Sequence, residues 1–284
     1  MELALGTVQF GLAYGVAGSG HPVSESETRT ILATAYEAGI RRLDTAPAYG
    51  DVEERLGGLC GRLGFSIVSK IPAMPAGLDS AEAVSWLRAS VDRSRRRLGD
   101  RLGGIIFHDA SLPIGPHGAA LRDALADAVA GSRIRVGASH YSAETLPDKA
   151  LWSDHAMAQL PGNAYDQRVA GLAAALAETE VSMRSAFLQG LLLAERSRAV
   201  ARVPEAADWL ATWDRWCVEA GLSPLAAALA VAKGFDAVNY CLIGVDSVAQ
   251  LRDIVAAWEA TSAIRAPELA GDDPRVFDPR QWRS

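Results

Sequence analysis

Four side chains with complementary acid–base chemistry follow consecutive β-rich runs in the first half of the chain. Asp44 lies at the end of the second run, and Tyr49 follows it in a short loop. Lys70 ends the third run and His108 ends the fourth. Because the carboxyl ends of parallel strands meet at one edge of a sheet, we expect the four side chains to converge there. An acid, a phenol, an amine and an imidazole at one place predict a proton-donating site.

The phenol of Tyr49 is the expected proton donor. An unperturbed tyrosine has a pKa of about 10 and is a poor acid at neutral pH. A nearby ammonium favours the phenolate, so Lys70 is expected to lower the pKa of Tyr49. Asp44 would pair with Lys70 and prevent a lone buried charge, while His108 would hydrogen-bond a substrate oxygen. Each residue alone has a purely structural interpretation, but the four together favour a general acid aimed at a carbonyl oxygen.

The remainder of the chain supplies the framework for these residues. Short β-rich runs alternate with longer helical runs, and several are almost continuously apolar, as strands covered on both faces are. This pattern predicts the α/β class, as a (β/α)8 TIM barrel in a single domain over residues 1–284, with an irregular tail from about residue 266. The expected strands are Leu3–Thr7, Ile40–Thr45, Phe65–Lys70, Gly104–His108, Ile134–Ser139, Ala156–Leu160, Val181–Ala186 and Val238–Val245.

Several helix ends are also readable from capping and stop residues. Ser24 with Glu27 predicts a capping box, and Ser80 predicts the start of a helix that runs to about Leu98. Ser142 with Glu144 predicts the start of another. The expected stops are Gly39, Gly99 and Gly221, the last between helices over Pro204–Ala220 and Ser223–Lys233.

Composition excludes several classes of protein. The net charge of −6 and pI of about 5.4 disfavour binding to nucleic acid or an anionic membrane. Three dispersed cysteines without a CxxC pair suggest neither a disulfide framework nor a zinc site, and they fit a reducing cytoplasm. We expect no signal peptide, no membrane span and no bound metal.

The order of these motifs resembles the aldo-keto reductase superfamily, from Leu5 to Leu251. In addition to the Asp-Thr-Ala…Tyr-Gly stretch at 44–50, Ser69-Lys70 and Phe107-His108, five further motifs carry the resemblance. They are Leu5-Gly6-Thr7-Val8-Gln9-Phe10-Gly11, Val136-Gly137-Ala138-Ser139, Gln159-Leu160-Pro161-Gly162-Asn163, Phe187-Leu188-Gln189-Gly190-Leu191-Leu192 and Leu242-Ile243-Gly244-Val245. The resemblance implies that the family's catalytic tetrad falls on Asp44, Tyr49, Lys70 and His108.

The resemblance also implies a nicotinamide dinucleotide bound in extended form across the barrel mouth, without a Rossmann domain. Tyr49 would then protonate a carbonyl oxygen as hydride reaches the carbon. The implied cofactor-binding residues are Thr7, Ser139, His140, Gln159, Arg184, Ser185, Phe187, Gln189, Gly190, Gly244, Asp246 and Gln250. Gln159 matches the family glutamine that holds the carboxamide.

Three of these positions depart from the family pattern. His140 replaces an asparagine, and Arg184 stands where many members place an aromatic against the nicotinamide, although its guanidinium could stack there. Asp246 stands near where NADPH-preferring members carry a basic residue. It would repel a 2′-phosphate or accept from a free 2′-hydroxyl, and its structural alternative is a helix N-cap. NADP is favoured by family habit, and NAD stays open.

The predicted function is an NAD(P)-dependent alcohol or aldose dehydrogenase or reductase, acting on an aldehyde, ketone or sugar carbonyl. The expected partner is a small molecule, and the expected assembly is a monomer or small homo-oligomer in the cytoplasm. One alternative is a non-enzymatic redox sensor that binds the cofactor and regulates a partner. A second is a barrel hydrolase with His108 and Asp109 as metal ligands, but the chain lacks further ligands at other strand ends.

Overall fold

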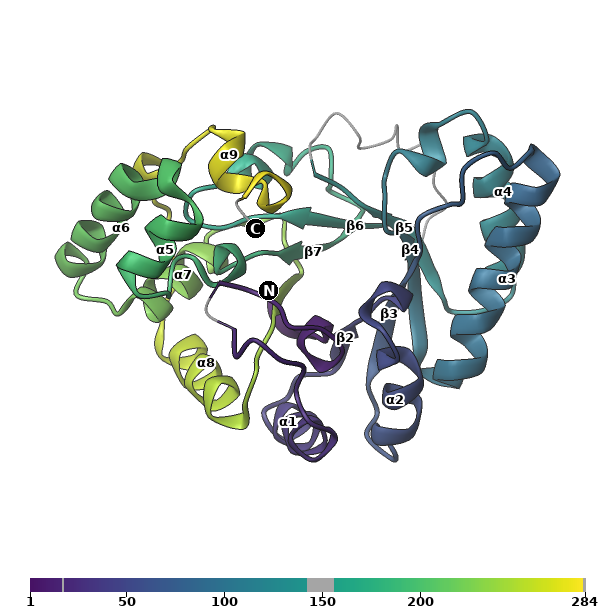
Figure 1. Cartoon of the computed structure of the whole chain (residues 1–284), viewed down its shortest axis with the longest axis horizontal. Helices are drawn as coiled ribbons and strands as arrows, with labels where there is room; N and C mark the ends of the chain where they lie inside the picture. Colours follow the sequence, from purple (N-terminus) through teal and green to yellow (C-terminus); the bar gives the residue numbers. More distant parts are fainter. Residues whose placement is uncertain (17, 142–155, 283–284) are drawn as a thin grey trace.

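A closed ring of parallel strands forms the centre of the molecule. The computed structural model describes residues 1–16, 18–141 and 156–282. Within them, eight strands pair in chain order, and the last pairs with the first (Figure 1). The strands are β1 (Glu2–Gly6), β2 (Arg42–Asp44), β3 (Ser66–Ile71), β4 (Leu102–Phe107), β5 (Arg135–Ser139), β6 (Ala156–Pro161), β7 (Glu180–Arg184) and β8 (Tyr240–Ile243). The predicted (β/α)8 barrel in a single domain is confirmed.

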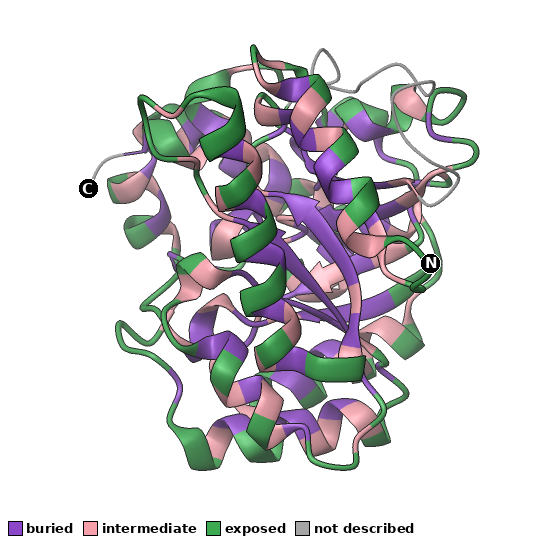
Figure 2. Ribbon diagram, turned by 90° about the vertical axis from the view of Figure 1, so that its right-hand side faces the viewer, coloured by how far each residue is buried: buried purple, intermediate pink, exposed green. Residues whose placement is uncertain are grey.

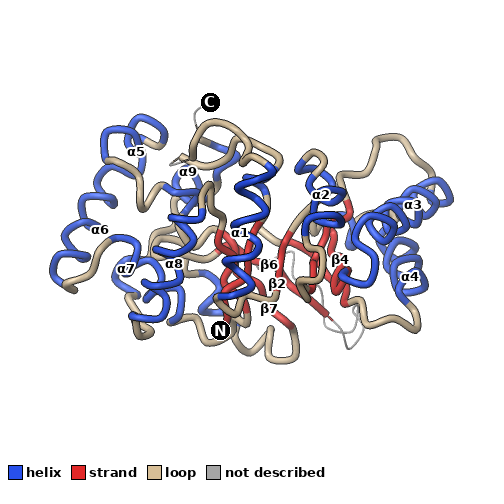
Figure 3. The backbone as a smooth tube through the Cα atoms, turned by 90° about the horizontal axis from the view of Figure 1, so that it is seen from below, coloured by secondary structure: helices blue, strands red, loops and turns tan. Residues whose placement is uncertain are grey.

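Helices surround this ring, as Figure 3 shows from below. They are α1 (Glu25–Glu37), α2 (Val52–Leu59), α3 (Ser80–Leu98), α4 (Gly118–Val129), α5 (Arg196–Arg202), α6 (Ala207–Glu219), α7 (Pro224–Lys233), α8 (Val248–Ala260) and α9 (Pro274–Phe277). The last helix lies in the tail that was expected to be irregular. No single described helix is both long and apolar enough to cross a membrane; the bent pair Pro204–Glu219 and Pro224–Lys233 meets the length and composition only when taken together.

All eight predicted strands are present, but β2 and β8 are shorter than expected by several residues and β5 and β7 by one. Ile40 precedes β2 and bonds back to Ala35 at the end of α1, and Val238 precedes β8 and bonds back to Phe235. Both backbone amides therefore close turns instead of joining a strand ladder. Apolar residues at a strand entrance contribute to the core without extending the sheet, which the sequence pattern does not distinguish.

Alternation along the strands fills the barrel and then places polar groups above the filling. Val68, Ile106 and Met157 are buried together as a small cluster inside the ring. Gly104 contributes no side chain to this layer, because a Cβ there would lie 2.8 Å from the Met157 sulfur. Two residues beyond Val68, Ile106 and Met157 come the polar side chains of positions 70, 108 and 159. Since side chains on a strand alternate with a period of two, these polar groups share the inner face at the carboxyl end.

The helix ends confirm the Ser24 cap and the predicted glycine stops at Gly39, Gly99 and Gly221, and they correct the cap of α3. Ser24 caps α1, and Gly39 and Gly99 adopt positive φ values after α1 and α3. The prediction that Ser80 caps α3 is wrong, since Asp79 accepts from the backbone of Ala81 and Glu82 while the Glu82 side chain accepts from Asp79 N–H. An Asp and a Ser in succession can both cap a helix, so sequence alone does not choose between them.

One half of the predicted Ser24–Glu27 capping box is absent. Ser24 accepts from the Glu27 backbone, but the Glu27 carboxylate accepts instead from Val248 N–H at the start of α8. This contact ties the first helix to the last helix of the barrel. Position 142 and position 144, predicted to start another helix, lie outside the described residues. Figure 2 shows the strands almost wholly buried and the exposed residues on the outer faces of the helices.

Candidate active site at the carboxyl end of the barrel

A buried ion pair joins β2 to β3 at the mouth of the barrel. Lys70 is 1% exposed, and its Nζ lies 2.5 Å from Asp44 Oδ1 and 3.1 Å from the Thr45 carbonyl oxygen. A lysine buried this deeply would be costly without a partner, so Asp44 offsets its charge. The pair stands directly above the apolar layer inside the ring.

Tyr49 is placed over this pair by the loop after β2. Pro47 begins a single helical turn that ends at Tyr49, and Gly50 follows with a φ of 76°, a conformation that favours glycine. Lys70 Nζ lies 5.3 Å from the centre of the Tyr49 ring. The His108 ring lies edge-on to Tyr49, with 6.3 Å between the ring centres. The four predicted residues are therefore brought together.

The electrostatics differ from the expectation at Tyr49. Burial raises the pKa of Tyr49, and this effect outweighs the lowering by the nearby Lys70 ammonium. The expectation that the pKa of Tyr49 falls is therefore wrong in direction for the protein alone, because desolvation depends on packing that the sequence does not show. Lys70 acts in the expected sense, but it offsets only part of the burial.

The other two titrating partners have definite charge states at neutral pH. Burial alone would lower the pKa of Lys70, but Asp44 and Tyr49 more than offset it, so the pKa lies above its usual value and the ammonium persists. Burial, followed by the charge on Lys70, lowers the pKa of His108 to about 4. His108 is therefore neutral at pH 7 and can donate a single hydrogen bond.

A second layer of hydrogen bonds holds Asp44 in place. Gln159 Nε2 donates to Asp44 Oδ2 at 2.8 Å, and Ser139 Oγ donates to Gln159 Oε1 at 3.4 Å. Thr7 Oγ1 donates to the Asp44 carbonyl oxygen at 2.9 Å. Asp44 is thus fixed from β1, β3 and β6 at once. Among these, Thr7, Ser139 and Gln159 were predicted to bind a cofactor.

A cavity of about 400 Å³ opens beside this network and runs towards β8. Asp44 and Tyr49 line it, whereas Lys70 and His108 are not among its lining residues. Ten of the twelve predicted cofactor residues line the cavity: Thr7, Gln159, Arg184, Ser185, Phe187, Gln189, Gly190, Gly244, Asp246 and Gln250. Ser139 and His140 are buried at the end of β5 and do not line it.

The loop after β7 forms one wall of the cavity in a strained conformation. Ser185, Leu188 and Gln189 have φ values of 66°, 47° and 50°, and no other non-glycine residue in the described ranges has a positive φ. The Asn163 side chain donates to the Ser185 carbonyl, and Val16 N–H donates to the Gln189 carbonyl. Such strain persists only where the surroundings impose it, and it commonly marks ligand-binding segments.

A family model for the aldo/keto reductase family matches residues 2–265 of this chain. The chain belongs to the aldo/keto reductase family. This family acts on small-molecule carbonyl substrates and generally uses nicotinamide cofactors. No curated protein matches the sequence.

Solved aldo-keto reductases share the barrel. One from Pseudomonas aeruginosa is 25% identical, with a TM-score of 0.64, over 90% of this chain and 88% of that one. AKR11C1 from Bacillus halodurans, in its holo form, is 19% identical with a TM-score of 0.73, over 99% and 95% of the two chains. The glycerol dehydrogenase AKR11B4 from Gluconobacter oxydans is 19% identical with a TM-score of 0.65, over 94% and 88%.

Gln9 lines the cavity but was not among the predicted cofactor-binding residues. It is 8% exposed, and its Oε1 has no hydrogen-bond partner among the described residues. Gly244 gives it room, since a Cβ at that position would lie 2.4 Å from Gln9 Nε2. A buried amide oxygen without a partner in a cavity wall fits a ligand that carries a hydrogen-bond donor. The residues present therefore fit a polar ligand that reaches from Tyr49 to β8.

The end of the cavity near β8 is acidic. Asp246 and Asp253 line it, and the one basic residue among the described lining residues is Arg184. The alternative interpretation of Asp246 as a helix N-cap is wrong, because Ser247 caps α8 by accepting from Gln250 N–H. Burial raises the pKa of Asp246, although hydrogen bonding to Ser19 lowers it in part.

The described residues contain no cluster of three or more His, Cys, Asp or Glu side chains that could hold a metal ion. His108 and Asp109, considered above as ligands of a hydrolase, have no third ligand within that part of the chain. The hydrolase alternative is also incompatible with membership of this family.

Proposed function

We propose that this protein is an NAD(P)-dependent carbonyl reductase or alcohol dehydrogenase in which Tyr49 is the general acid and base. One observation carries the proposal: the Tyr49 ring lies 5.3 Å from the ammonium of Lys70, which is itself paired with Asp44, and Tyr49 and Asp44 line the same cavity. A phenol beside a fixed ammonium can give up a proton and leave a stabilised phenolate. Family membership supports the same class of reaction.

The roles of the four residues follow from their contacts. Tyr49 donates its proton to the substrate oxygen, and Lys70 stabilises the phenolate that forms. Asp44 holds Lys70 in place and keeps it charged. His108, neutral because its pKa is near 4, donates a hydrogen bond to the same substrate oxygen and sets its orientation. In the reverse direction the Tyr49 phenolate accepts the alcohol proton.

A bound nicotinamide cofactor would supply the hydride. Thr7, Gln159, Gln189 and Gly244 line the cavity from both sides and would hold it, and Gln9 would add one acceptor. NADP is the expectation from family habit. The lining carboxylates Asp246 and Asp253 favour NAD, because they would repel a 2′-phosphate. We propose that they reduce or reverse the preference for NADP over NAD.

The expected setting of this activity follows from charge and cysteine chemistry. The net charge of −6 fits a small-molecule partner better than nucleic acid. Cys60, Cys217 and Cys241 are buried free thiols, which fits a reducing cytoplasm. We propose that the protein works there as a monomer or small homo-oligomer.

Tryptophan fluorescence titration with NADH and with NADPH tests the cofactor site directly. Saturable quenching by at least one of them, followed by oxidation of that cofactor with an aldehyde, is expected. Binding without turnover across aldehydes, ketones and aldoses would instead support the redox-sensor interpretation. Binding of neither nucleotide would contradict both.

A further inference from the structure

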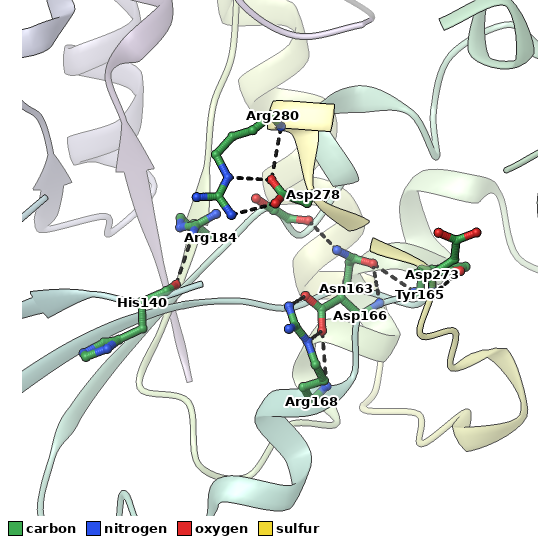
Figure 4. Close-up of polar contacts among 10 residues, drawn as sticks. His140, Asn163, Tyr165, Asp166, Arg168, Arg184, Asp273, Asp278 and Arg280 are labelled. Carbon is green, nitrogen blue, oxygen red and sulfur yellow. Dashed lines mark hydrogen bonds and ion pairs between the residues drawn. The ribbon is translucent and has the colours of Figure 1, made fainter. Parts of the chain in front are cut away.

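The cavity beside Tyr49 carries a positive charge that the described residues do not offset. Arg184 ends β7 and lines the cavity with Tyr14 and Tyr49. Its guanidinium donates to the His140 carbonyl oxygen at 3.1 Å (Figure 4). The same guanidinium lies 4.2 Å from the centre of the Tyr141 ring. Within the described ranges no carboxylate forms an ion pair with it. Lys70, the other cation near the site, is neutralised by Asp44.

The side chain of Arg184 extends away from the β8 end of the cavity. Its side chain reaches across the end of β6 to His140 at the end of β5. Asp246 and Asp253, at the opposite end of the cavity, follow β8. The charge on Arg184 lies close enough to Tyr14, Tyr49 and His108 to act electrostatically on all three side chains. Arg184 therefore stands at the end where the carbonyl of a substrate would be reduced.

Neighbouring residues hold this guanidinium in a fixed place. Tyr141 lies between two guanidinium groups, with Arg280 on it at 3.8 Å and Arg184 at 4.2 Å. Arg280 is itself paired with the buried Asp278 in the C-terminal tail, so its charge is offset (Figure 4). Ser185, the next residue, is held at a φ of 66° by the Asn163 side chain. A guanidinium fixed in this way loses little conformational freedom when it binds an anion.

We propose that Arg184 forms a carboxylate-binding subsite and that the preferred substrates are small carbonyl compounds that also carry a carboxylate, such as a semialdehyde acid or a uronic acid. Planar guanidinium groups match planar carboxylates in geometry, and charge-assisted hydrogen bonds of this kind are among the stronger polar contacts. Arg184 donates one N–H group to His140 and keeps others for a ligand. The inference rests on the proposed function for its chemistry, but the anion subsite itself does not need the cofactor.

Matched substrate pairs separate this role from stacking on the nicotinamide. The pairs are 4-oxobutanoate with butanal, and D-glucuronate with D-glucose. The wild type is expected to prefer each anionic member in kcat/KM, and Arg184→Gln should reduce the anionic-to-neutral ratio by roughly 30-fold. Arg184→Lys should retain part of it. Arg88→Gln is the control and should leave the ratio unchanged, because Arg88 is an exposed residue of α3 that is paired with Asp127 away from the cavity.

The outcomes are distinguishable. A wild type that does not prefer the anionic members, or an Arg184→Gln ratio equal to that of the wild type, overturns the inference. Loss of both substrates together with weaker cofactor affinity overturns it in favour of stacking. Succinate binding, measured by calorimetry without nucleotide, gives an independent readout. If succinate binds in an Arg184-dependent way while no nucleotide binds, the subsite stands and the proposed function fails; if succinate does not bind, the subsite fails.

Discussion

Two adjacent residues on β3 belong to two different buried polar clusters, one closed and one open to a cavity. Ser69 faces outward, where its hydroxyl donates to the Glu53 carboxylate at 2.6 Å, and Ser94 and Arg97 complete the cluster. Lys70 faces inward to Asp44 at 2.5 Å. Glu53 and Lys70 are both 1% exposed, so burial does not distinguish the two clusters.

The difference lies in what surrounds each charge. The Glu53 cluster is closed between the barrel and helices α2 and α3, and three donors satisfy its carboxylate. The Lys70 cluster opens onto a cavity through Asp44 and Tyr49, and that cavity contains Gln9 Oε1, which has no hydrogen-bond partner in the described part of the chain. A buried charge therefore marks a candidate site only when a cavity and an unsatisfied polar group lie beside it. The closed cluster is expected to contribute stability and the open one chemistry.

The largest expected effect is on the open cluster. Tyr49→Phe removes the proton donor and should lower kcat by about 10³-fold, within the range for loss of a general acid. Cofactor affinity should stay within a few-fold of the wild type, since the ring remains. Steady-state turnover and fluorescence titration measure the two effects separately. Tyr36→Phe, the same change outside the cavity, is the control, and equal loss in both variants would refute the assignment.

The closed cluster is expected to respond in the opposite way. Glu53→Gln removes the charge that Arg97 and two hydroxyl groups satisfy, and it should lower the free energy of unfolding by roughly 2–3 kcal/mol. Cofactor affinity and kcat per folded molecule should not change. Urea denaturation and active-site titration test this separation. A large loss of kcat without a loss of stability would mean that the two clusters are coupled.

The two clusters should also differ in their response to pH. His108 has a pKa of about 4 in the folded protein, against about 6.5 unperturbed. The unfolded chain therefore binds more protons between these values, so stability should be fully present above pH 6.5 and fall as the pH drops towards 4. His108→Asn should flatten this slope in urea melts, and Glu53→Gln should not. An unchanged slope in His108→Asn would show that His108 is not held neutral by burial.

The smallest expected effect lies at the far end of the cavity. Asp246→Asn removes one negative charge near the proposed 2′-position, and it should raise NADPH affinity relative to NADH by about tenfold. Fluorescence titration of both nucleotides gives the ratio. Asp127→Asn, on the distant surface of α4, should leave the ratio as it is. No shift in Asp246→Asn would place the adenosine elsewhere.

The barrel and the convergence of the four acid–base residues could be predicted from the sequence. Strand ends marked by polar residues predicted the meeting of Asp44, Tyr49, Lys70 and His108, because strand alternation and barrel closure are properties of pattern and topology. Motifs that resemble those of the family predicted ten of the residues that line the cavity.

Other features depend on three-dimensional packing and were not predictable. The pKa of Tyr49 rises because burial outweighs Lys70, and burial is not visible in sequence. The backbone is left-handed at Ser185, Leu188 and Gln189. None of them is a glycine, the residue type from which a left-handed conformation could have been predicted. Gln9 becomes notable only because its amide oxygen lies in the cavity wall without a hydrogen-bond partner among the residues that the structure describes.

Single-turnover hydride transfer isolates the proton-donor role of Tyr49. The protein would be preloaded with whichever reduced nucleotide it binds, mixed with an aldehyde, and followed by stopped-flow absorbance in wild type and Tyr49→Phe. We expect both proteins to bind the nucleotide and hydride transfer in Tyr49→Phe to be slower by about 10³-fold. Transfer at the wild-type rate in Tyr49→Phe would contradict the claim that this cluster supplies the proton.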